Sequence, residues 1–459
     1  MSQTYNPSND LATENIGKLL WNYSIPAIIG TVVMSLYNIV DRIFIGQGVG
    51  PLAISGLALT FPFMIILMAF GMLIGAGSAS RISITLGQGN KIKAEKILAN
   101  AVILTFIISG SVIILSLIFM DDLLRLFGGT DNTIQYAHDY MIIIIPGGIL
   151  TALYFGLNNI MRASGHPKKA MYNILLGAII NIILDPLFIF VFDWGIQGAA
   201  IATVISYFIG TLSVSSHFFL KTTSIRFHIQ NFKLEKEIVK SILSIGMSPF
   251  SMQIGTSLVV ILINGTLLKH GGDLAIGAYG IINSVNMLVV MFIIGLNQGS
   301  QPIIGYNFGA QNYDRMFKAL RLSAIAGTGL TTIGFVIGVF VPHQVVSLFT
   351  TDIELQNIAT TALRISVLMF PIVGFQIVIS NFYQSIGKAR MAIFLSLTRQ
   401  FIFLVPAILI LPPIFGLNGA WSAMPVSDGL SSIVFATISI FFIKKFKKQH
   451  YNGQLTVEN

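Results

Sequence analysis

Long apolar runs recur along the whole chain and constrain its fold more than any other feature. Each run is about as long as the roughly 20 residues that a helix needs to cross a bilayer. The runs are continuous rather than alternating, which predicts helices instead of barrel strands. We therefore expect an all-α polytopic membrane protein with twelve transmembrane helices, at residues 18–45, 52–78, 98–119, 134–158, 170–192, 196–220, 241–268, 274–298, 318–340, 357–382, 391–415 and 419–443.

Composition supports this fold class. The 459 residues are 54% hydrophobic and 10% charged, which excludes an ordinary soluble protein of this size. A net charge of +9 would suggest nucleic acid in a soluble protein, but here the charge lies in short loops, so we expect no nucleic-acid partner. The chain has no cysteine, hence no disulfide and no cysteine-based metal site. Residues 1–15 lack a basic start and a cleavage site, and we expect no cleaved signal peptide.

The loop charges orient the predicted helices. Of the 27 Lys and Arg, 22 fall on the side that holds both predicted termini, and the opposite loops carry the acids Asp121, Asp122, Asp131, Asp193, Asp273, Asp352 and Glu354. Basic loops stay cytoplasmic. We expect both termini in the cytoplasm of a bacterium, with the helices in its inner membrane.

The two halves of the chain repeat one another. Five landmarks of the first half return in the second at a nearly constant offset, among them Gly165 at Gly387 and Gly198 at Gly419. This predicts two pseudo-symmetric six-helix lobes, residues 1–220 and 241–459, the second ending in a basic tail. Residues 221–240 form a cytoplasmic linker, in part an amphipathic surface helix. Such repeats are typical of transporters with a site at or near the interface of the lobes.

An acid lies inside the fifth predicted span, in the stretch Asn181-Ile-Ile-Leu-Asp185-Pro186. An ionised Asp at the bilayer centre costs about 3 kcal/mol on insertion scales. Asn181 and Asp185 are four residues apart and share a helix face, and Pro186 is expected to bend the helix. The stretch fits either an ion or proton site or an interhelical hydrogen bond.

The first span carries the second acid. Met34, Tyr37, Asn38 and Asp41 share one helix face, and Pro26 upstream is expected to bend the helix. Asp41, Asn158, Asn181, Asp185 and Thr203 could converge on one pocket, where two carboxyl groups would hold a proton or coordinate Na⁺ through oxygen. The second half lacks counterparts of Asp41 and Asp185, so we expect an ion site in the first lobe alone.

Simpler interpretations stay open for several of these residues. Asp41 could form an exposed ion pair with Arg42, and Thr203 could bond the carbonyl four residues earlier. Asn158 could simply join helices. Asp428, in the last span, fits either a second functional acid or a packing contact.

Motifs for catalysis are missing. Gly48–Ala53 matches a loose dinucleotide pattern but lies in a short turn between spans, and there is no GxxxxGK[ST] or HExxH. We expect no enzyme, no catalytic residue and no cofactor.

The segment Asn38-Ile-Val-Asp41-Arg42-Ile-Phe-Ile-Gly46, together with Pro26 and Asn181–Pro186, resembles the MATE family (multidrug and toxic compound extrusion), in its DinF-like and MepA-like bacterial branch. The resemblance covers nearly the whole chain. It implies a secondary active antiporter that exports cationic and amphiphilic compounds against H⁺ or Na⁺ and functions as a monomer in the lipid bilayer. It also implies an ion-coupling cluster at Asp41, Asn158, Asn181, Asp185 and Thr203, with Met34, Tyr37 and Asn38 beside the substrate path.

Two alternatives depart from this interpretation. The NorM-like branch uses acids in the seventh and tenth helices, whereas here the seventh span has none and the tenth has only Arg364. A lipid-linked oligosaccharide flippase of the same superfamily is the second; those tend to have extra helices or a cationic central cavity, whereas most basic residues here lie in loops.

Overall fold

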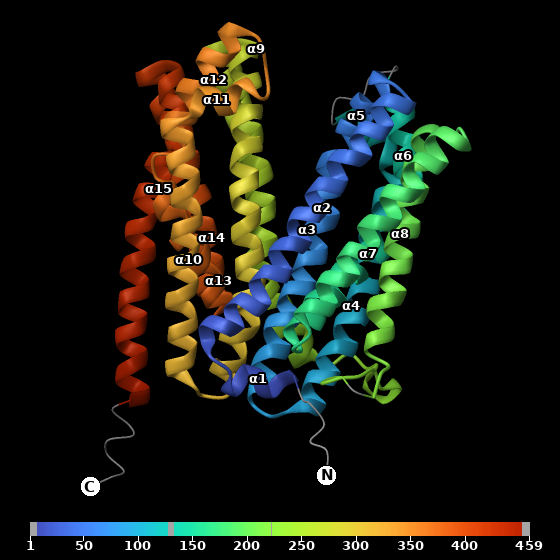
Figure 1. Ribbon diagram of the computed structural model, residues 1–459, viewed down its shortest axis with the longest axis vertical. Coiled ribbons are helices and arrows are strands. Elements are labelled where there is room, and N and C mark those ends of the chain that lie inside the picture. Colours follow the sequence, from blue (N-terminus) through green and yellow to red (C-terminus); the bar gives the residue numbers. More distant parts are fainter. Residues whose placement is uncertain (1–6, 127–132, 222, 452–459) are drawn as a thin grey trace. The chain divides into compact units, whose positions relative to one another are not determined.

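A computed structural model describes residues 7–126, 133–221 and 223–451 (Figure 1). Within these ranges the regular structure is helical, without a β-strand: α1 (Pro7–Thr13), α2 (Ile16–Gly48), α3 (Pro51–Gly87), α4 (Lys91–Ile118), α5 (Met120–Leu126), α6 (Ile134–Ala163), α7 (Pro167–Pro186), η1 (Leu187–Val191), α8 (Gly195–His217), η2 (Ile229–Asn231), α9 (Lys236–Gly309), α10 (Tyr313–Phe340), α11 (Pro342–Ser347), α12 (Ile353–Ser366), α13 (Phe370–Ser385), α14 (Ala389–Leu397), η3 (Thr398–Leu404) and α15 (Val405–Tyr451). Asp131 and the two chain ends, 1–6 and 452–459, lie outside the described residues.

The predicted all-α polytopic fold is confirmed. In the described part of the chain, nine helices are long and apolar enough to cross a membrane, and α12 with α13, bent by 56°, makes ten. Two of these ten segments each contain two helices, because the helical backbone is interrupted at Gly272 in α9 (φ 65°) and at Gly416 in α15 (φ 57°). Glycine adopts this left-handed backbone without strain. Splitting the two long runs at these glycines gives the twelve predicted spans.

The helices run further than the apolar stretches that predicted them. The second span, expected to end at residue 78, continues as α3 to Gly87, and α4 begins at Lys91, ahead of the predicted start at 98. Asn90 caps that start, because its side chain accepts a hydrogen bond from the backbone N–H of Lys93. Hydropathy marks the membrane part of a helix, whereas helix hydrogen bonds continue until a cap or a glycine ends them.

The chain forms two compact units. Unit 1 comprises Met1–Ile254, Ile294–Ser323 and Phe382–Ile393, and unit 2 comprises Gly255–Ile293, Ala324–Asn381 and Phe394–Asn459. Unit 1 thus combines the first half of the chain with two stretches of the second half. The sequence-based division at residues 220 and 240 follows the internal repeat and stays a prediction.

Within unit 1, α3 and α9 approach each other at four glycines, Gly77, Gly87, Gly246 and Gly309, which we call the glycine seam. A Cβ on Gly77 would lie 2.2 Å from the carbonyl oxygen of Ile242, and one on Gly246 would lie 1.7 Å from that of Leu73. Both distances are far below van der Waals contact. The backbones can therefore touch only because these residues lack side chains.

The linker at 221–240 is not the predicted amphipathic helix. Apart from residue 222, which lies outside the described part, it is a turn, an irregular stretch, the short 3₁₀-helix η2 and the start of α9. Asn100 on α4 holds it: its Nδ2 donates to the carbonyl oxygen of Lys233 (3.0 Å), and its Oδ1 accepts from the N–H of Glu235 (2.9 Å). Lys96 adds an ion pair with Glu235 of 2.8 Å. Apolar contacts hold the linker as well, because Ile225 and Ile238 are buried in a cluster with residues of α4.

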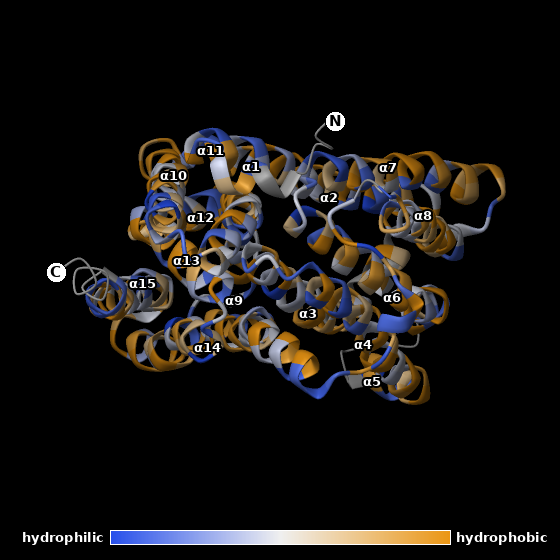
Figure 2. Ribbon diagram, turned by 90° about the horizontal axis from the view of Figure 1, so that it is seen from below, coloured by the Kyte–Doolittle hydropathy of each residue, from blue (hydrophilic) through white to orange (hydrophobic). Residues whose placement is uncertain are grey.

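Unit 2 has its own apolar core. It is centred on buried side chains of α9, α12, α13 and α15, including Ile263, Tyr279, Leu363 and Trp421. Figure 2 shows hydrophobic residues along the helices of the chain, interrupted by hydrophilic ones. Each such helix offers apolar side chains both to its neighbours and to a surrounding lipid phase.

Candidate functional site

Asp41 on α2 and Asp185 on α7 lie together in unit 1. Asp41 is 8% exposed and Asp185 is fully buried. The helices α2 and α7 pack side by side (Figure 1), and the two carboxyl groups lie close enough to interact electrostatically. Two carboxylates can only accept hydrogen bonds, so a direct bond between them would require a proton.

Asn181 extends the pair to a third helix. It lies one turn before Asp185 on α7, and its Nδ2 donates to Asp185 Oδ1 (3.2 Å) and to Thr203 Oγ1 on α8 (3.3 Å). Asn181 is 2% exposed and Thr203 6%. Of the five residues expected to converge, Asp41, Asn181, Asp185 and Thr203 lie together here. Their role in ion coupling stays a prediction.

Oxygen atoms of this cluster remain without a donor. Asp41 Oδ1, Asn181 Oδ1 and Asp185 Oδ2 are buried and have no hydrogen-bond partner among the described residues. Orphaned buried acceptors are rare and call for a proton, a water or a cation. Hard cations such as Na⁺ take oxygen ligands of this kind. Among the described residues, no group of three or more His, Cys, Asp or Glu side chains gathers as a metal site would require.

A small cavity lies beside the cluster. It leaves only about 10 Å³ for the centre of a water molecule, and it is lined by Met34, Tyr37, Tyr154, Gly177, Ala178, Asn181, Thr203, Ser206 and Tyr207. Drug-sized ligands occupy sites of roughly 300–1,000 Å³. The cavity in this conformation therefore suits water or an ion better than a drug.

Three tyrosines line the cavity. The hydroxyls of Tyr37 on α2 and Tyr207 on α8 share a hydrogen bond of 2.7 Å. Tyr154 on α6 donates to the carbonyl oxygen of Asn173 (2.9 Å), and its ring centroid lies 5.5 Å from that of Tyr207. Gly177 and Gly210 make room for this ring, since a Cβ on either would lie 2.7 Å or less from Tyr154 atoms.

Two of the predicted residues are located elsewhere or bonded differently, and one alternative is excluded. Asn158 is buried, but its Nδ2 donates to the carbonyl oxygen of Tyr154 one turn earlier (2.8 Å), and it does not line the cavity. Asn38 is exposed and donates to the carbonyl oxygen of Met34. The alternative of an exposed Asp41–Arg42 pair is wrong: Asp41 is buried, and the exposed Arg42 lies over the ring of Phe61, 5.8 Å from its centroid.

Comparison with known proteins assigns the family. The MatE family model matches the chain twice, over residues 26–187 and 247–409. The chain belongs to the MATE family. The start of the second match, at residue 247, follows that of the first, at residue 26, by the same interval that separates Gly419 from Gly198 in the internal repeat.

Relatives and solved structures of MATE proteins agree with this. The chain is 27% identical to a multidrug export protein MepA of Staphylococcus haemolyticus over 95% of both chains. It is 29% identical to a protein of that description in Staphylococcus aureus, over 93% of this chain and 94% of the other. A crystal structure of MATE in the bent conformation has a TM-score of 0.92 at 25% identity, covering 98% of this chain and 100% of that one. An outward-facing multidrug resistance MATE transporter has a TM-score of 0.90, also at 25% identity, covering 97% and 100%.

Sequence reasoning missed Tyr154, Ser206 and Tyr207, although all three line the cavity of this MATE protein. A tyrosine or serine within an apolar helix is common, and the sequence does not indicate which way it points. The usable signal was the pair of glycines, Gly177 and Gly210, in the two helices that face Tyr154.

The two prolines lie in different settings. Pro26 lies within the continuous helix α2. Pro186 ends α7, and the chain passes on into the π-helix η1 instead of an ordinary helical turn. A π-helical turn accommodates a missing backbone donor. The expected helix bends at Pro26 and Pro186 stay predictions.

Proposed function

We propose that this MATE protein is a secondary active multidrug efflux antiporter, which exports cationic and amphiphilic compounds by alternating access in exchange for protons. The observation that carries the proposal is the buried contact between Asp41 and Asp185. Burying two acids in a membrane protein costs several kcal/mol, so a purely structural role leaves that cost without a compensating function.

The relatives support the class of substrate. Two of them carry the name multidrug export protein MepA, and both align over more than nine-tenths of this chain. Cationic compounds suit a site whose acids gain a negative charge whenever a proton leaves. Because the cavity beside the acids is too small for a drug, we infer that substrate binds in another conformation or in a wider part of the path, next to Met34 and Tyr37.

Protons are favoured over Na⁺ by the geometry of the acids. Asp41 Oδ1 and Asp185 Oδ2 meet no donor among the described residues, and the two carboxyl groups interact electrostatically, so a proton held by one would relieve their repulsion. Na⁺ would sit between the same oxygens and Asn181 Oδ1. Separate pH and Na⁺ gradients distinguish the two ions.

The basic loop after α3 supports the expected orientation. Gly87 ends α3 just before the basic loop that contains Lys91 and Lys93. Taken with the positive-inside pattern, this supports cytoplasmic termini, a bacterial inner membrane and, since the acids lie within one chain, function as a monomer.

A transport cycle follows from these elements. In the outward-facing state, Asp41 and Asp185 take up external protons, and a neutral cluster attracts a cationic substrate less. Loss of substrate and a change in α2 at Pro26 would precede opening towards the cytoplasm. Protons then leave to the cytoplasm and new substrate binds. Coupling free energies of this kind are typically about 1–3 kcal/mol, or 5- to 150-fold in affinity.

The test is efflux of ethidium from proteoliposomes that contain the purified protein, under an imposed pH gradient and then under a Na⁺ gradient. The variants are Asp41→Asn and Asp185→Asn. The matched control is Asp193→Asn, because Asp193 is exposed and has a positive φ of 53°, which asparagine also adopts. We expect pH-driven efflux in the wild type and the control, and a loss of at least roughly tenfold in both cluster variants.

Other outcomes change the proposal. Efflux driven by Na⁺ and lost in both cluster variants would replace the proton by Na⁺ at the same site. Efflux that survives both substitutions would move the coupling site elsewhere. If the wild type exports no cation under either gradient, the lipid-linked oligosaccharide flippase becomes the leading hypothesis.

A further inference from the structure

Unit 2 holds a partly buried charged pair that the proton cluster does not use. Arg399 lies in the π-helix η3, and its Nε donates to Asp428 Oδ1 on α15 at 2.5 Å. The side chain of Asp428 is 3% exposed and that of Arg399 is 31% exposed. A lone buried carboxylate would be costly, and the guanidinium offsets that cost.

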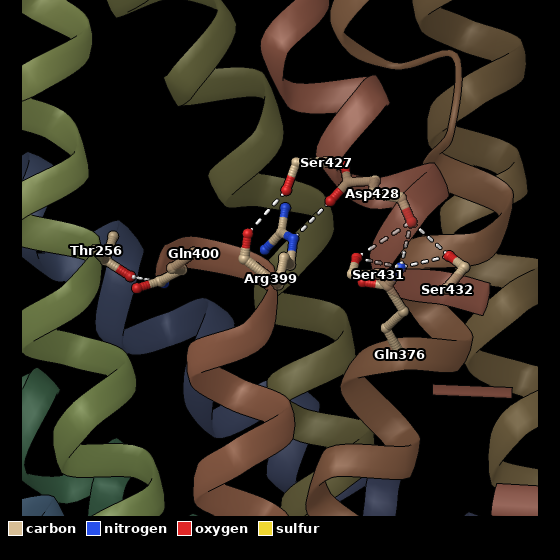
Figure 3. A network of polar contacts seen from close by, with 8 residues as sticks. All are labelled: Thr256, Gln376, Arg399, Gln400, Ser427, Asp428, Ser431 and Ser432. Atoms are coloured by element: carbon tan, nitrogen blue, oxygen red, sulfur yellow. Dashed lines mark hydrogen bonds and ion pairs between the residues drawn. The ribbon is translucent and has the colours of Figure 1, made fainter. Parts of the chain in front are cut away.

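A polar shell fixes the pair (Figure 3). Gln376 Nε2 donates to the backbone oxygen of Asp428 (2.6 Å) and also bonds the hydroxyls of Ser431 and Ser432. Ser427 Oγ donates to the backbone oxygen of Arg399 (2.8 Å). On the other side of η3, Gln400 Nε2 donates to Thr256 Oγ1 on α9 (2.8 Å). The turn that carries Arg399 is thus held on both flanks.

The internal repeat relates this pair to the cavity of the first half. At the offset that separates Gly165 from Gly387, Tyr154 corresponds to Gln376 and Gly177 to Arg399. At the offset that separates Gly198 from Gly419, Ser206 corresponds to Ser427 and Tyr207 to Asp428. The four residues of the first half all line the cavity beside the acids. Their four counterparts all belong to the network around Arg399.

The residues at these corresponding positions differ in chemistry between the two halves. In the first half, Gly177 has no side chain, and the hydroxyl of Tyr154 lies 2.7 Å from where its Cβ would be. In the second half, a guanidinium extends from the corresponding position, and a carboxylate takes the place of Tyr207. A cation attached to the chain therefore extends from the position that borders the cavity in the first half.

We propose that the Asp428 carboxylate, held in place by Gln376 and by the hydrogen bond of Ser427 to the Arg399 backbone, is a cation site of the second half, which the chain's own Arg399 occupies. The consequence of this site for ion coupling rests on the proposed antiport. Because the cation of the site is attached to the chain, the second half binds no mobile ion. Ion exchange is then carried out by Asp41 and Asp185 alone. Shortening Arg399 would open the site to a free guanidinium ion.

The site can be tested by chemical rescue without any transport. Full-length Arg399→Ala protein in detergent should unfold at a lower temperature than the wild type, by roughly 4 °C or more, because Asp428 loses its partner. Millimolar guanidinium chloride should restore at least half of that shift, whereas equal NaCl should not. Arg364→Ala is the control, since Arg364 is exposed on α12; neither its unfolding temperature nor its response to guanidinium should differ from the wild type.

A double variant makes the test independent of the folding of the single one. Arg399→Ala with Asp428→Asn removes both charges, so it should be more stable than Asp428→Asn alone and should not respond to guanidinium. The inference is overturned if Arg399→Ala is stabilised equally by NaCl, or if the double variant is no more stable than Asp428→Asn. Because the readout is unfolding, failure of the antiport hypothesis would leave this result unchanged, and the reverse also holds.

Discussion

Gly87 and Gly309 face each other's helix across the glycine seam in the same way. A Cβ on Gly87 would lie 2.0 Å from the carbonyl oxygen of Tyr306, and a Cβ on Gly309 would lie 2.0 Å from that of Ile84. Each glycine thus contacts the backbone of the partner helix one turn before the other glycine. Since Gly309 follows Gly87 by the same interval as Gly387 follows Gly165, the contact obeys the internal repeat.

Substitution of the seam glycines is expected to destabilise the protein. Gly87→Ala and Gly309→Ala should each lower the free energy of unfolding by about 1–3 kcal/mol, because backbone must move to admit the methyl group. Gly110→Ala on α4 is the control: no atom lies within 4 Å of its added Cβ, and alanine favours a helix by up to about 1 kcal/mol. Thermal unfolding in detergent should give opposite signs, and a drop at Gly110 as large as at the seam would contradict the prediction.

The Tyr37–Tyr207 hydrogen bond allows a double-mutant test. Tyr207→Phe keeps the ring but leaves the buried Tyr37 hydroxyl without that partner, which should cost about 1–3 kcal/mol of unfolding free energy. Adding Tyr37→Phe removes the orphaned group, so the double variant should recover part of the loss. Equal stability of the single and double variants would show that the hydroxyls do not depend on each other.

Asn100 is expected to control access to the linker. Asn100→Leu removes the amide that binds Lys233 and Glu235, so the linker should open more often, and trypsin should cleave at residues 221–240 roughly tenfold faster. Asn357→Leu, at a position of α12 remote from the linker in sequence, should leave the cleavage rate unchanged. Unaltered cleavage in Asn100→Leu would mean that other contacts hold the linker.

His166, in the loop between α6 and α7, predicts a pH dependence of stability. Burial, with a smaller contribution from Lys169, lowers the pKa of His166 from 6.5 to about 4. Between these values the unfolded chain binds a proton that the folded protein does not, so stability falls as pH drops from about 6.5 towards 4.

The measurement for His166 is the unfolding temperature between pH 7.5 and pH 5. His166→Asn should lose less stability over this range than the wild type, whereas His343→Asn, at an exposed position, should behave like the wild type. Parallel curves for His166→Asn and the wild type would assign the pH dependence to other groups.

Much of the architecture could be read from the sequence. The twelve spans follow from hydropathy, and the pairing of halves follows from landmarks such as Gly165 and Gly387. Asp41 and Asp185 stood out because an acid in an apolar helix is costly. Their helices lie in the same half of the chain, so the sequence could also predict that the two acids lie close together.

Partners across helices could not be predicted in the same way. Whether Asp428 contacts Arg399 depends on the rotation of both helices and on the π-helical turn in η3. Neither the rotation nor the π-helical turn can be predicted from the local sequence pattern. The same holds for Tyr207, whose hydroxyl finds Tyr37 from a different helix. The prediction of a surface helix in the linker was wrong. Asn100, which is far away in sequence, makes hydrogen bonds with the linker backbone instead.

Unit 1 also has a consequence for synthesis on the ribosome. Its three stretches end at Ile393, so the nascent first half cannot finish folding when residue 254 emerges. Until Tyr306 is made, the backbone at Gly87 has no neighbour to pack against. The first half therefore keeps part of its packing surface exposed in the membrane until a later stretch of its own chain is inserted. Two fragments expressed separately would have to associate before unit 1 could complete its fold.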